Sequence, residues 1–246
     1  MGQTAVVLAA GLGSRLKERT KNRPKGLLEV GGKPLLVRSI ETLRAFGVDR
    51  FLIGTGYLSE QYEALFSDDP TIRCVRNDHY FSSGSMYTLY VLRKLLNDDF
   101  LLVESDLIYE RRALDKLQRD RHKDVVLASG KTSAGDEVYV EVNRGGMLTN
   151  LSKDPTKISS VFGEFVGISK ISKECATEMN RIAEETFSKR DLHLEYEQVL
   201  VKTGRVRPVS VLKIDDLVWA EIDDESHLQR VESSVLPKIE SAEHKT

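Results

Sequence analysis

The sequence has few of the features that mark specialised protein classes. Its two cysteines, Cys74 and Cys175, lie far apart without metal-ligand spacing, so neither a disulfide framework nor a zinc site is expected. It lacks an apolar run long enough to cross a bilayer and the patterned start of a secretory signal. Its net charge of -2 excludes a broadly basic surface. These absences predict a cytoplasmic globular protein with no nucleic-acid and no membrane partner.

Apolar runs alternate with amphipathic stretches in the first half of the chain. Four short apolar runs are typical of buried strands, at 4–10, 51–54, 72–75 and 100–105. Helical patterns come between them, from Pro34 to Gly47, from Ser59 onward, and from about Met86 to Leu96. Strands that alternate with helices predict a parallel, twisted sheet with right-handed crossovers.

The second half changes character after about residue 124. Strand-like segments follow one another there without long helices, at 124–129, 137–143, 147–151 and 161–169, with a turn predicted at 143–146. Further elements are expected as helices near 173–187 and 194–202, a strand at 207–213 and a closing helix from about 224.

The pattern as a whole predicts an α/β fold, a Rossmann-like three-layer sandwich with a mostly parallel twisted sheet. We expect a single domain over 1–240, with a smaller β-rich lid or insertion at about 130–170. The residues at 241–246 form a polar tail that we expect to fray.

A glycine-containing loop follows the first expected strand. The stretch 8–15, LAAGLGSR, combines small residues with two glycines whose backbone N–H groups can point at phosphate oxygens, and Arg15 adds a cation. A Rossmann fingerprint requires glycine where Leu16 stands, and the Gly-Lys-Ser/Thr of a P-loop is absent. Taken alone, such a loop fits a structural turn as well as it fits phosphate binding.

The wider stretch 6–36 favours phosphate binding. VVLAAGLGSRL followed by RPKGLLEVGGKPLL closely resembles the entry motif of the NTP-transferase family that acts on sugar phosphates and phosphocholine, LAAGxGxRL followed by PK and GxxPLL. The resemblance implies a nucleotide-diphospho-sugar transferase-like fold and a loop that surrounds the base and triphosphate of an NTP. It also implies that Lys25 neutralises charge at the reacting phosphoryl groups, and it makes Lys25, Arg15 and Asp106 the expected catalytic residues.

Two aspartates complete this resemblance. Asp106 follows the run 100–105, at the end of a parallel strand where α/β sheets present ligands, although a lone aspartate there is more often a helix cap. Asp223 stands in a late Glu-Ile-Asp segment. In the family these two positions hold Mg²⁺ against the triphosphate, and carboxylates with substrate phosphates are ligands that Mg²⁺ uses. Glu221 and Asp224 are neighbouring alternatives, set aside because the family's late aspartate matches Asp223.

The segment 77–89, NDHYFSSGSMYTL, leads into the third expected helix. Ser83 or Ser85 can cap that helix, and a hydroxyl-rich helix N-terminus is also a good anion site. The segment resembles that of phosphocholine and 2-aminoethylphosphonate cytidylyltransferases, its Ser-Gly-Ser-Met version being most similar to the latter. It lacks the Gly-Thr-Ala of sugar nucleotidyltransferases, which favours CTP as the donor. The residues then expected to bind nucleotide are Leu8, Ala9, Ala10, Gly11, Gly13, Ser14, Arg15, Lys25, Asn77, Ser83 and Ser85.

An acceptor that carries an ammonium needs anionic or aromatic partners. A quaternary ammonium favours an aromatic cage, whereas a primary amine favours carboxylates. The chain has one tryptophan, which favours a primary amine. The residues expected to bind the acceptor are Glu137, Tyr139, Glu195, Tyr196, Glu197 and Trp219. For the Leu-Glu-Tyr-Glu segment at 194–197, a solvated helix face is the alternative.

The leading hypothesis is a transfer of CMP from CTP to 2-aminoethylphosphonate with release of pyrophosphate. Phosphocholine, inositol phosphate or a sugar 1-phosphate are alternative acceptors on the same fold. A regulatory protein that binds nucleotide without catalysis is the alternative from another class, and Leu16 argues against a dinucleotide-dependent dehydrogenase. The sequence leaves open a homodimer or a fusion to another pathway domain.

Overall fold

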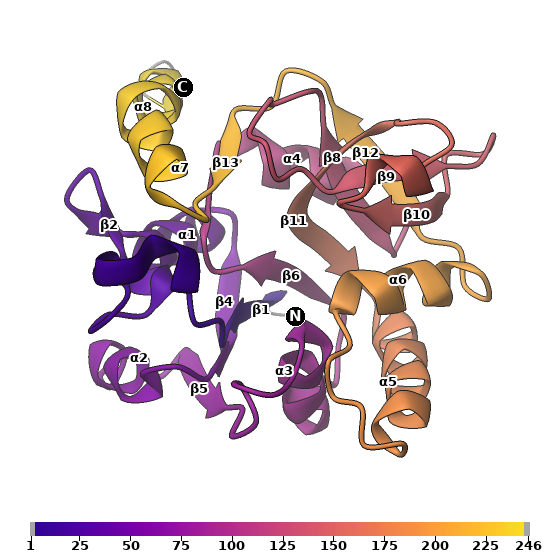
Figure 1. Cartoon of the computed structure of the whole chain (residues 1–246), viewed down its shortest axis with the longest axis horizontal. Coiled ribbons are helices and arrows are strands. Elements are labelled where there is room, and N and C mark those ends of the chain that lie inside the picture. The colour runs from indigo at the N-terminus through magenta and orange to yellow at the C-terminus, as the bar shows by residue number, and fades with distance from the viewer. Residues whose placement is uncertain (1–2, 244–246) are drawn as a thin grey trace.

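In the computed structural model, which describes residues 3–243, a nine-stranded sheet forms the middle layer, with helices on both faces (Figure 1). Its strands are β1 (Gln3–Ala9), β4 (Val48–Thr55), β5 (Ile72–Arg76), β6 (Phe100–Glu104), β8 (Val125–Ser129), β9 (Tyr139–Val142), β10 (Leu148–Ser152), β11 (Gly163–Ile171) and β12 (Ser210–Ile214). Seven of them follow the order β10-β9-β11-β6-β1-β4-β5, while β8 pairs with β11 and β12 pairs with β8.

Strand β1 lies near the centre of this sheet and is buried on both faces. Ala5 and Val7 belong to one apolar cluster and Val6 to another, and all three side chains are 0% exposed. Successive strand residues point to opposite faces, so an uninterrupted apolar run suits a strand that is covered on both sides. β1 pairs in parallel with β4 and β6, and β4 with β5, which confirms the parallel sheet predicted from the first half of the chain.

The helices form the two outer layers. They are α1 (Leu35–Ala45), α2 (Ser59–Leu65), α3 (Ser85–Leu92), α4 (Arg112–Arg119), α5 (Lys173–Phe187), α6 (Tyr196–Gly204), α7 (Glu225–Arg230) and α8 (Leu236–Glu243). The apolar residues of α1 and α4 join one cluster, and those of α3, α5 and α6 join the cluster on the opposite face. The three-layer sandwich is thus confirmed, although the sequence pattern had not predicted α4.

The β-rich region expected as a lid at about 130–170 is built differently. β9 and β10 form the antiparallel hairpin predicted around the turn at 143–146. However, β11 pairs antiparallel with β6, and the hairpin extends the main sheet beyond β11. The buried residues Phe165 and Ile168 draw β11 into the core, and the cavity described below is lined from this region by residues of the loop 130–138 together with Lys153, Glu164 and Phe165.

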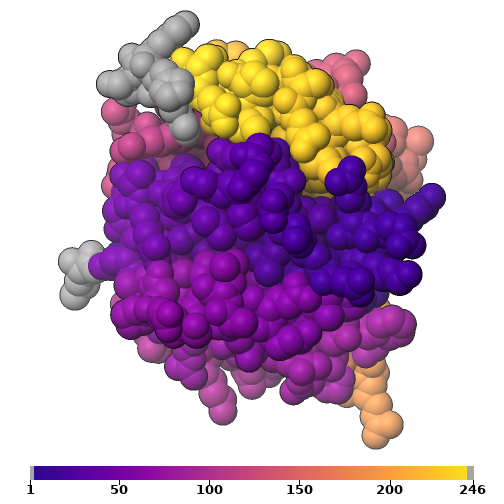
Figure 2. Space-filling model, turned by 90° about the vertical axis from the view of Figure 1, so that its left-hand side faces the viewer, coloured from indigo at the N-terminus to yellow at the C-terminus, as the bar shows by residue number. Residues whose placement is uncertain are grey.

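The C-terminal segments pack against the N-terminal part of the chain. A small sheet pairs β13 (Trp219–Glu221) antiparallel with β7 (Leu107–Tyr109). Apolar residues of α7 and α8 share a third cluster with Leu16, Leu28 and Leu35, and Figure 2 shows this contact as yellow atoms lying on indigo ones. The polar tail expected at 241–246 starts inside α8, which continues to Glu243, and 244–246 lie outside the described residues.

No helix formed by residues 3–243 combines the length and the apolar character that crossing a membrane requires.

Leu43 tests the packing of α1 on the sheet. Its side chain is 0% exposed, so Leu43→Ala is expected to lower the free energy of unfolding by about 2–5 kcal/mol, because it removes apolar contacts and leaves a cavity. Leu65, the last residue of α2, is 47% exposed, and Leu65→Ala is the matched control with a loss below about 0.5 kcal/mol. Urea denaturation measures both. Equal losses would contradict the core position of Leu43.

Candidate active site

A cavity of about 410 Å³ opens at the carboxyl ends of β1 and β6. Ligands in open α/β sheets bind at this edge, because the strand ends and the loops after them converge there. The sequence-predicted residues that line the cavity are Leu8, Ala9, Ala10, Gly11, Gly13, Ser14, Arg15, Lys25, Ser83, Ser85, Asp106, Glu137, Glu195, Tyr196, Glu197, Trp219 and Asp223. The structure therefore brings together residues from the whole length of the sequence.

Two expected residues, Asn77 and Tyr139, are absent from the cavity lining. Asn77 is 0% exposed and donates hydrogen bonds to Ser83 Oγ and to Thr88 Oγ1, both at 3.0 Å. Its carbonyl oxygen accepts from the backbone N–H of His79 at 2.9 Å, so its polar atoms are used within the protein. Asn77 thus fixes the loop that carries Ser83, a role that replaces the expected contact with nucleotide.

Tyr139 is the first residue of β9, and it is paired with Ser152 of β10 and with Glu164 of β11. The cavity is lined instead by the residues just before it, Glu137 and Val138. Tyr139 thus lies next to the cavity lining, at the start of the strand, and its contact with an acceptor stays a prediction.

The glycine loop is shaped by Gly13. Its φ of 62° lies in the left-handed region, and an added Cβ would lie 3.0 Å from Thr20 Cγ2 and 3.2 Å from Lys25 Cβ. The carbonyl of Gly13 accepts a hydrogen bond from Thr20 Oγ1 at 2.8 Å. A side chain at this position would therefore strain the turn and press on the segment that carries Lys25.

Lys25 lies between the two predicted metal ligands. Its Nζ is 2.5 Å from Asp223 Oδ1, forms a short ion pair with Asp106, and is 3.8 Å from Glu221 Oε1. Burial alone would lower the pKa of Lys25, but the negative charges of Asp106 and Asp223 outweigh it and raise that pKa above its ordinary value. The ammonium of Lys25 is therefore charged. Lys25 as a whole residue is 9% exposed and lies in the cavity wall.

Strand pairing brings the two aspartates together. β7 follows Asp106 and β13 precedes Asp223, and the backbone N–H of Ile222 donates to the carbonyl of Asp106 at 3.1 Å. Arg15 Nη2 lies 2.5 Å from Asp223 Oδ2. Burial works to raise the pKa of Asp223, yet a hydrogen bond with Asp136 and the charge of Lys25 hold it well below its usual range.

The carboxylates near Lys25 fit a divalent cation. Asp106 Oδ1 is buried and has no hydrogen-bond partner within residues 3–243, while its other oxygen pairs with Lys25. Single oxygens of Asp136, Glu221 and Asp223 lie within 4.8 Å of one another, and the same holds for Glu104, Asp106 and Glu221. An all-oxygen set of this kind is what Mg²⁺ prefers.

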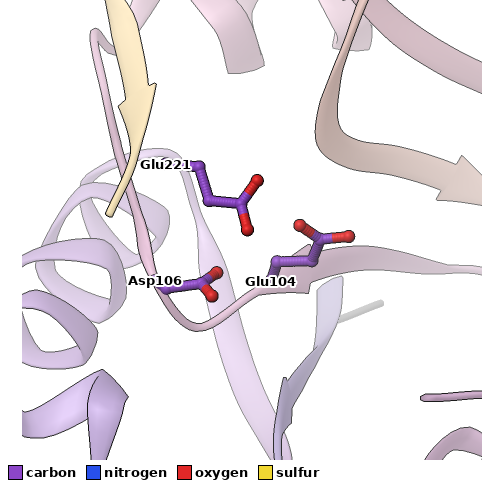
Figure 3. Close-up of side chains that lie close together, drawn as sticks. All are labelled: Glu104, Asp106 and Glu221. Atoms are coloured by element: carbon purple, nitrogen blue, oxygen red, sulfur yellow. The ribbon is translucent and has the colours of Figure 1, made fainter. Parts of the chain in front are cut away.

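Glu221 and Glu104 are the acidic residues that sequence reasoning set aside or missed. Figure 3 shows the carboxylates of Glu104, Asp106 and Glu221 pointing toward one another. A signal for Glu221 was present, because residues two apart on a strand share a face, and Trp219, Glu221 and Asp223 are spaced in this way. The other missed lining residues that carry polar or aromatic groups include Tyr80, Asp136, Lys153, Glu164, Phe165 and Arg230.

Three residues of the segment 194–197 line the cavity, namely Glu195, Tyr196 and Glu197. Glu195 Oε2 accepts hydrogen bonds from the Ser85 backbone N–H at 2.9 Å and from Ser85 Oγ at 2.5 Å, so it caps α3 in place of Ser83 or Ser85. Tyr196 donates its hydroxyl to Glu104 Oε1 at 2.5 Å. Glu197 Oε2 is buried without a hydrogen-bond partner among the described residues, and burial raises the pKa of Glu197 to about 7.

The family model of the MobA-like NTP transferase domain matches residues 5–197. The chain belongs to this family. The match covers the glycine loop, Lys25, Asp106 and Tyr196, and ends before the segment with Asp223. The chain is therefore a nucleotidyltransferase of the cytidylyltransferase type, in line with the relatives that follow.

Three curated relatives illustrate the family. Choline-phosphate cytidylyltransferase of Streptococcus pneumoniae is 30% identical over 157 residues, which are 60% of this chain and 68% of that protein. CMP-5'-(3-aminopropyl)phosphonate synthase of Streptomyces rubellomurinus is 28% identical over 89% of this chain and 37% of its own length. 2-Aminoethylphosphonate cytidylyltransferase of Lancefieldella rimae is 33% identical over 42% of this chain and 43% of its own length. The chain thus spans well under half of the last two relatives.

A solved structure supports the fold. The CTP:phosphocholine cytidylyltransferase from Streptococcus pneumoniae superimposes with a TM-score of 0.80 at 23% identity, covering 94% of this chain and 98% of that one. Identity at this level carries the fold only, which is that of the nucleotide-diphospho-sugar transferases.

Lys25→Met tests the ion-pair cluster. The substitution leaves Asp106 and Asp223 without their shared cation, so we expect the free energy of unfolding at neutral pH to fall by about 3–5 kcal/mol. Lys21, whose side chain is 66% exposed, provides the control Lys21→Met, with a change below about 0.5 kcal/mol. Urea denaturation in the absence of divalent cations measures both. An unchanged stability of Lys25→Met would contradict the buried cluster.

Proposed function

We propose that the chain transfers CMP from CTP to 2-aminoethylphosphonate and releases pyrophosphate. The observation that carries this proposal is one cavity lined by two chemically different groups of side chains. Arg15 and Lys25 stand beside the glycine loop, which suits a nucleoside triphosphate. Glu104, Tyr196 and Glu197 add carboxylates and an aromatic ring, which suits a small zwitterion with an ammonium group.

The acceptor phosphonate carries negative charge at neutral pH, so its oxygen can attack without a general base. An oxygen–phosphorus bond forms to the α-phosphorus of CTP. The bond from that phosphorus to the bridging oxygen breaks, and the leaving pyrophosphate takes the electron pair. The main obstacle is repulsion between two anions, which Lys25 and Arg15 offset by fixed positive charge in a partly buried site.

Asp106 and Asp223 are the residues that would hold Mg²⁺, with Glu221 adjacent to both. The bound ion would supply positive charge to the triphosphate oxygens and orient them. Lys25 keeps the two aspartates at one point of the cavity wall, and Arg15 steadies the outer oxygen of Asp223. These side chains thereby arrange the phosphate end before substrates arrive.

CTP as the donor rests on the helix-start segment and on the relatives. Ser83 and Ser85 line the cavity beside the N-terminus of α3, and the buried Asn77 amide donates a hydrogen bond to Ser83 Oγ. The relatives named for transfer of CMP or for CTP support the same base. We propose that this segment contacts the nucleotide and that the segment 194–197 and Trp219 contact the acceptor.

A pyrophosphate-release screen tests the proposal. Purified chain with Mg²⁺ is combined with CTP, UTP, GTP or dTTP and with 2-aminoethylphosphonate, phosphocholine, inositol 1-phosphate or glucose 1-phosphate. We expect the highest kcat/KM for CTP with 2-aminoethylphosphonate. Higher turnover of phosphocholine, the acceptor in the name of one relative, would overturn the proposed acceptor, and nucleotide binding without any turnover would favour a regulatory protein.

Asp106→Asn and Asp223→Asn test the metal-holding pair in the same assay. Each keeps the size of the side chain but removes a charge, so we expect kcat/KM to fall at least about 100-fold. Asp68→Asn, at an exposed position outside the cavity, is the control with unchanged turnover. Full activity of either site variant would remove that aspartate from the proposed mechanism.

A further inference from the structure

The cavity contains a carboxylate that forms no ion pair with Lys25, although it faces the carboxylates of Asp106 and Glu221. Glu104 is the last residue of β6, two positions before Asp106, and its carboxylate faces the cavity (Figure 3). Lys25 forms ion pairs with Asp106, Glu221 and Asp223, but no lysine or arginine of residues 3–243 forms one with Glu104. The negative charge of Glu104 therefore has no partner within the described protein.

The surroundings make an unpaired charge at this position costly. Carboxylate oxygens of Glu104, Asp106 and Glu221 lie within 4.8 Å of one another, so like charges surround Glu104. Glu197 Oε2 is a buried carboxylate oxygen that lacks a hydrogen-bond partner among residues 3–243. Carboxylates placed together in this way favour binding of a cation, because a buried charge needs a partner or a proton.

The carboxylate of Glu104 is also fixed in direction. Tyr196 donates its hydroxyl to Oε1 at 2.5 Å, which leaves Oε2 without a hydrogen bond from the described residues. Behind Oε2 stands Gly167 of β11, with a φ of 79°, where a Cβ would approach Oε2 to 2.6 Å. The glycine therefore makes room for the carboxylate, and the tyrosine keeps it from rotating.

A fixed carboxylate distinguishes between kinds of ammonium. A primary ammonium donates N–H groups and forms charge-assisted hydrogen bonds at about 2.7–2.9 Å. A trimethylammonium has no N–H, and its methyl shell keeps the charge farther away, so it gains most from aromatic faces. The aromatic residues of the cavity lining are Tyr62, Tyr80, Phe165, Tyr196 and Trp219, and the ring nearest to Glu104 uses its hydroxyl, that of Tyr196, to bind the carboxylate.

We propose that Glu104 recognises the ammonium group of the acceptor and selects a primary amine over a quaternary one. The proposal rests on the proposed transfer of CMP to an amine-bearing phosphonate, and it adds the residue that determines specificity. Tyr196 acts as its positioning residue, and Gly167 provides the space. Lys25 forms no ion pair with Glu104, although the Glu104 carboxylate lies within 4.8 Å of those of Asp106 and Glu221.

Glu104→Gln tests the proposal, because it keeps the shape and an acceptor for the Tyr196 hydroxyl while removing the charge. We expect kcat/KM for 2-aminoethylphosphonate to fall roughly 10- to 100-fold, mainly through a higher KM, with the KM for CTP unchanged. Turnover of ethylphosphonate, which lacks the amine, and of phosphocholine should change less than about threefold. The ratio of kcat/KM for 2-aminoethylphosphonate to kcat/KM for ethylphosphonate should therefore fall by about the factor that is lost for 2-aminoethylphosphonate.

Glu184→Gln is the matched control. Glu184 Oε1 accepts a hydrogen bond from the Tyr90 hydroxyl at 2.9 Å, so it forms the same kind of pair as Glu104 and Tyr196 but lies outside the cavity. Its kinetics should equal those of the wild type. Glu104→Gln is expected to fold, because it keeps the size of the side chain and an acceptor for the Tyr196 hydroxyl, and its urea midpoint checks this.

Three outcomes are distinguishable. Equal losses for 2-aminoethylphosphonate and ethylphosphonate in Glu104→Gln would overturn the recognition of the ammonium, as would unchanged kinetics for both. A wild-type protein that uses CTP with 2-aminoethylphosphonate would leave the proposed function intact in either case. A wild-type protein that turns over no amine-bearing acceptor would overturn the proposed function, and the role of Glu104 with it.

Discussion

Lys25 connects three segments of the chain that are distant in sequence: the loop after β1, the turn after β6 and the residues after β13. Its ion pairs with Asp106 and Asp223 allow two buried carboxylates to face the same point of the cavity. Without this cation the carboxylates would repel each other in a partly buried environment. The small β7–β13 sheet and the packing of α7 and α8 on the N-terminal segment hold in place the backbone segments that carry these three residues.

Lys25 compensates some carboxylates of the cavity wall and leaves others without a positive partner. Lys25 compensates Asp106, Glu221 and Asp223, whereas Glu104 and Glu197 have no ion pair within residues 3–243. A triphosphate with its metal and an ammonium-bearing acceptor would together complete this distribution of charge. The proposed acceptor class and the proposed role of Glu104 therefore both rest on the same observation, that only some carboxylates of the cavity wall pair with Lys25.

The sequence predicted elements whose signals are local. The apolar run of β1 and the helical period of α5 required no distant contacts to be recognised, and the glycine loop and Lys25 carry a recognisable motif. Contacts between distant residues could not be predicted in this way. Glu195 caps α3 from 110 positions away, and Asn77 donates hydrogen bonds to Thr88 and Ser83 inside the protein. β11 pairs with β6, a strand about 60 positions earlier in the chain.

The most direct test of the central claim is the position of the divalent cation in crystals grown with CTP and Mn²⁺ in place of Mg²⁺. Anomalous scattering locates Mn²⁺ independently of any assumed ligand. The account predicts one peak bonded to the carboxylates of Asp106 and Asp223 and to the triphosphate, with Lys25 beside it. Bound CTP with a peak at Glu104 and Glu197, or with no contact to either aspartate, would contradict the account.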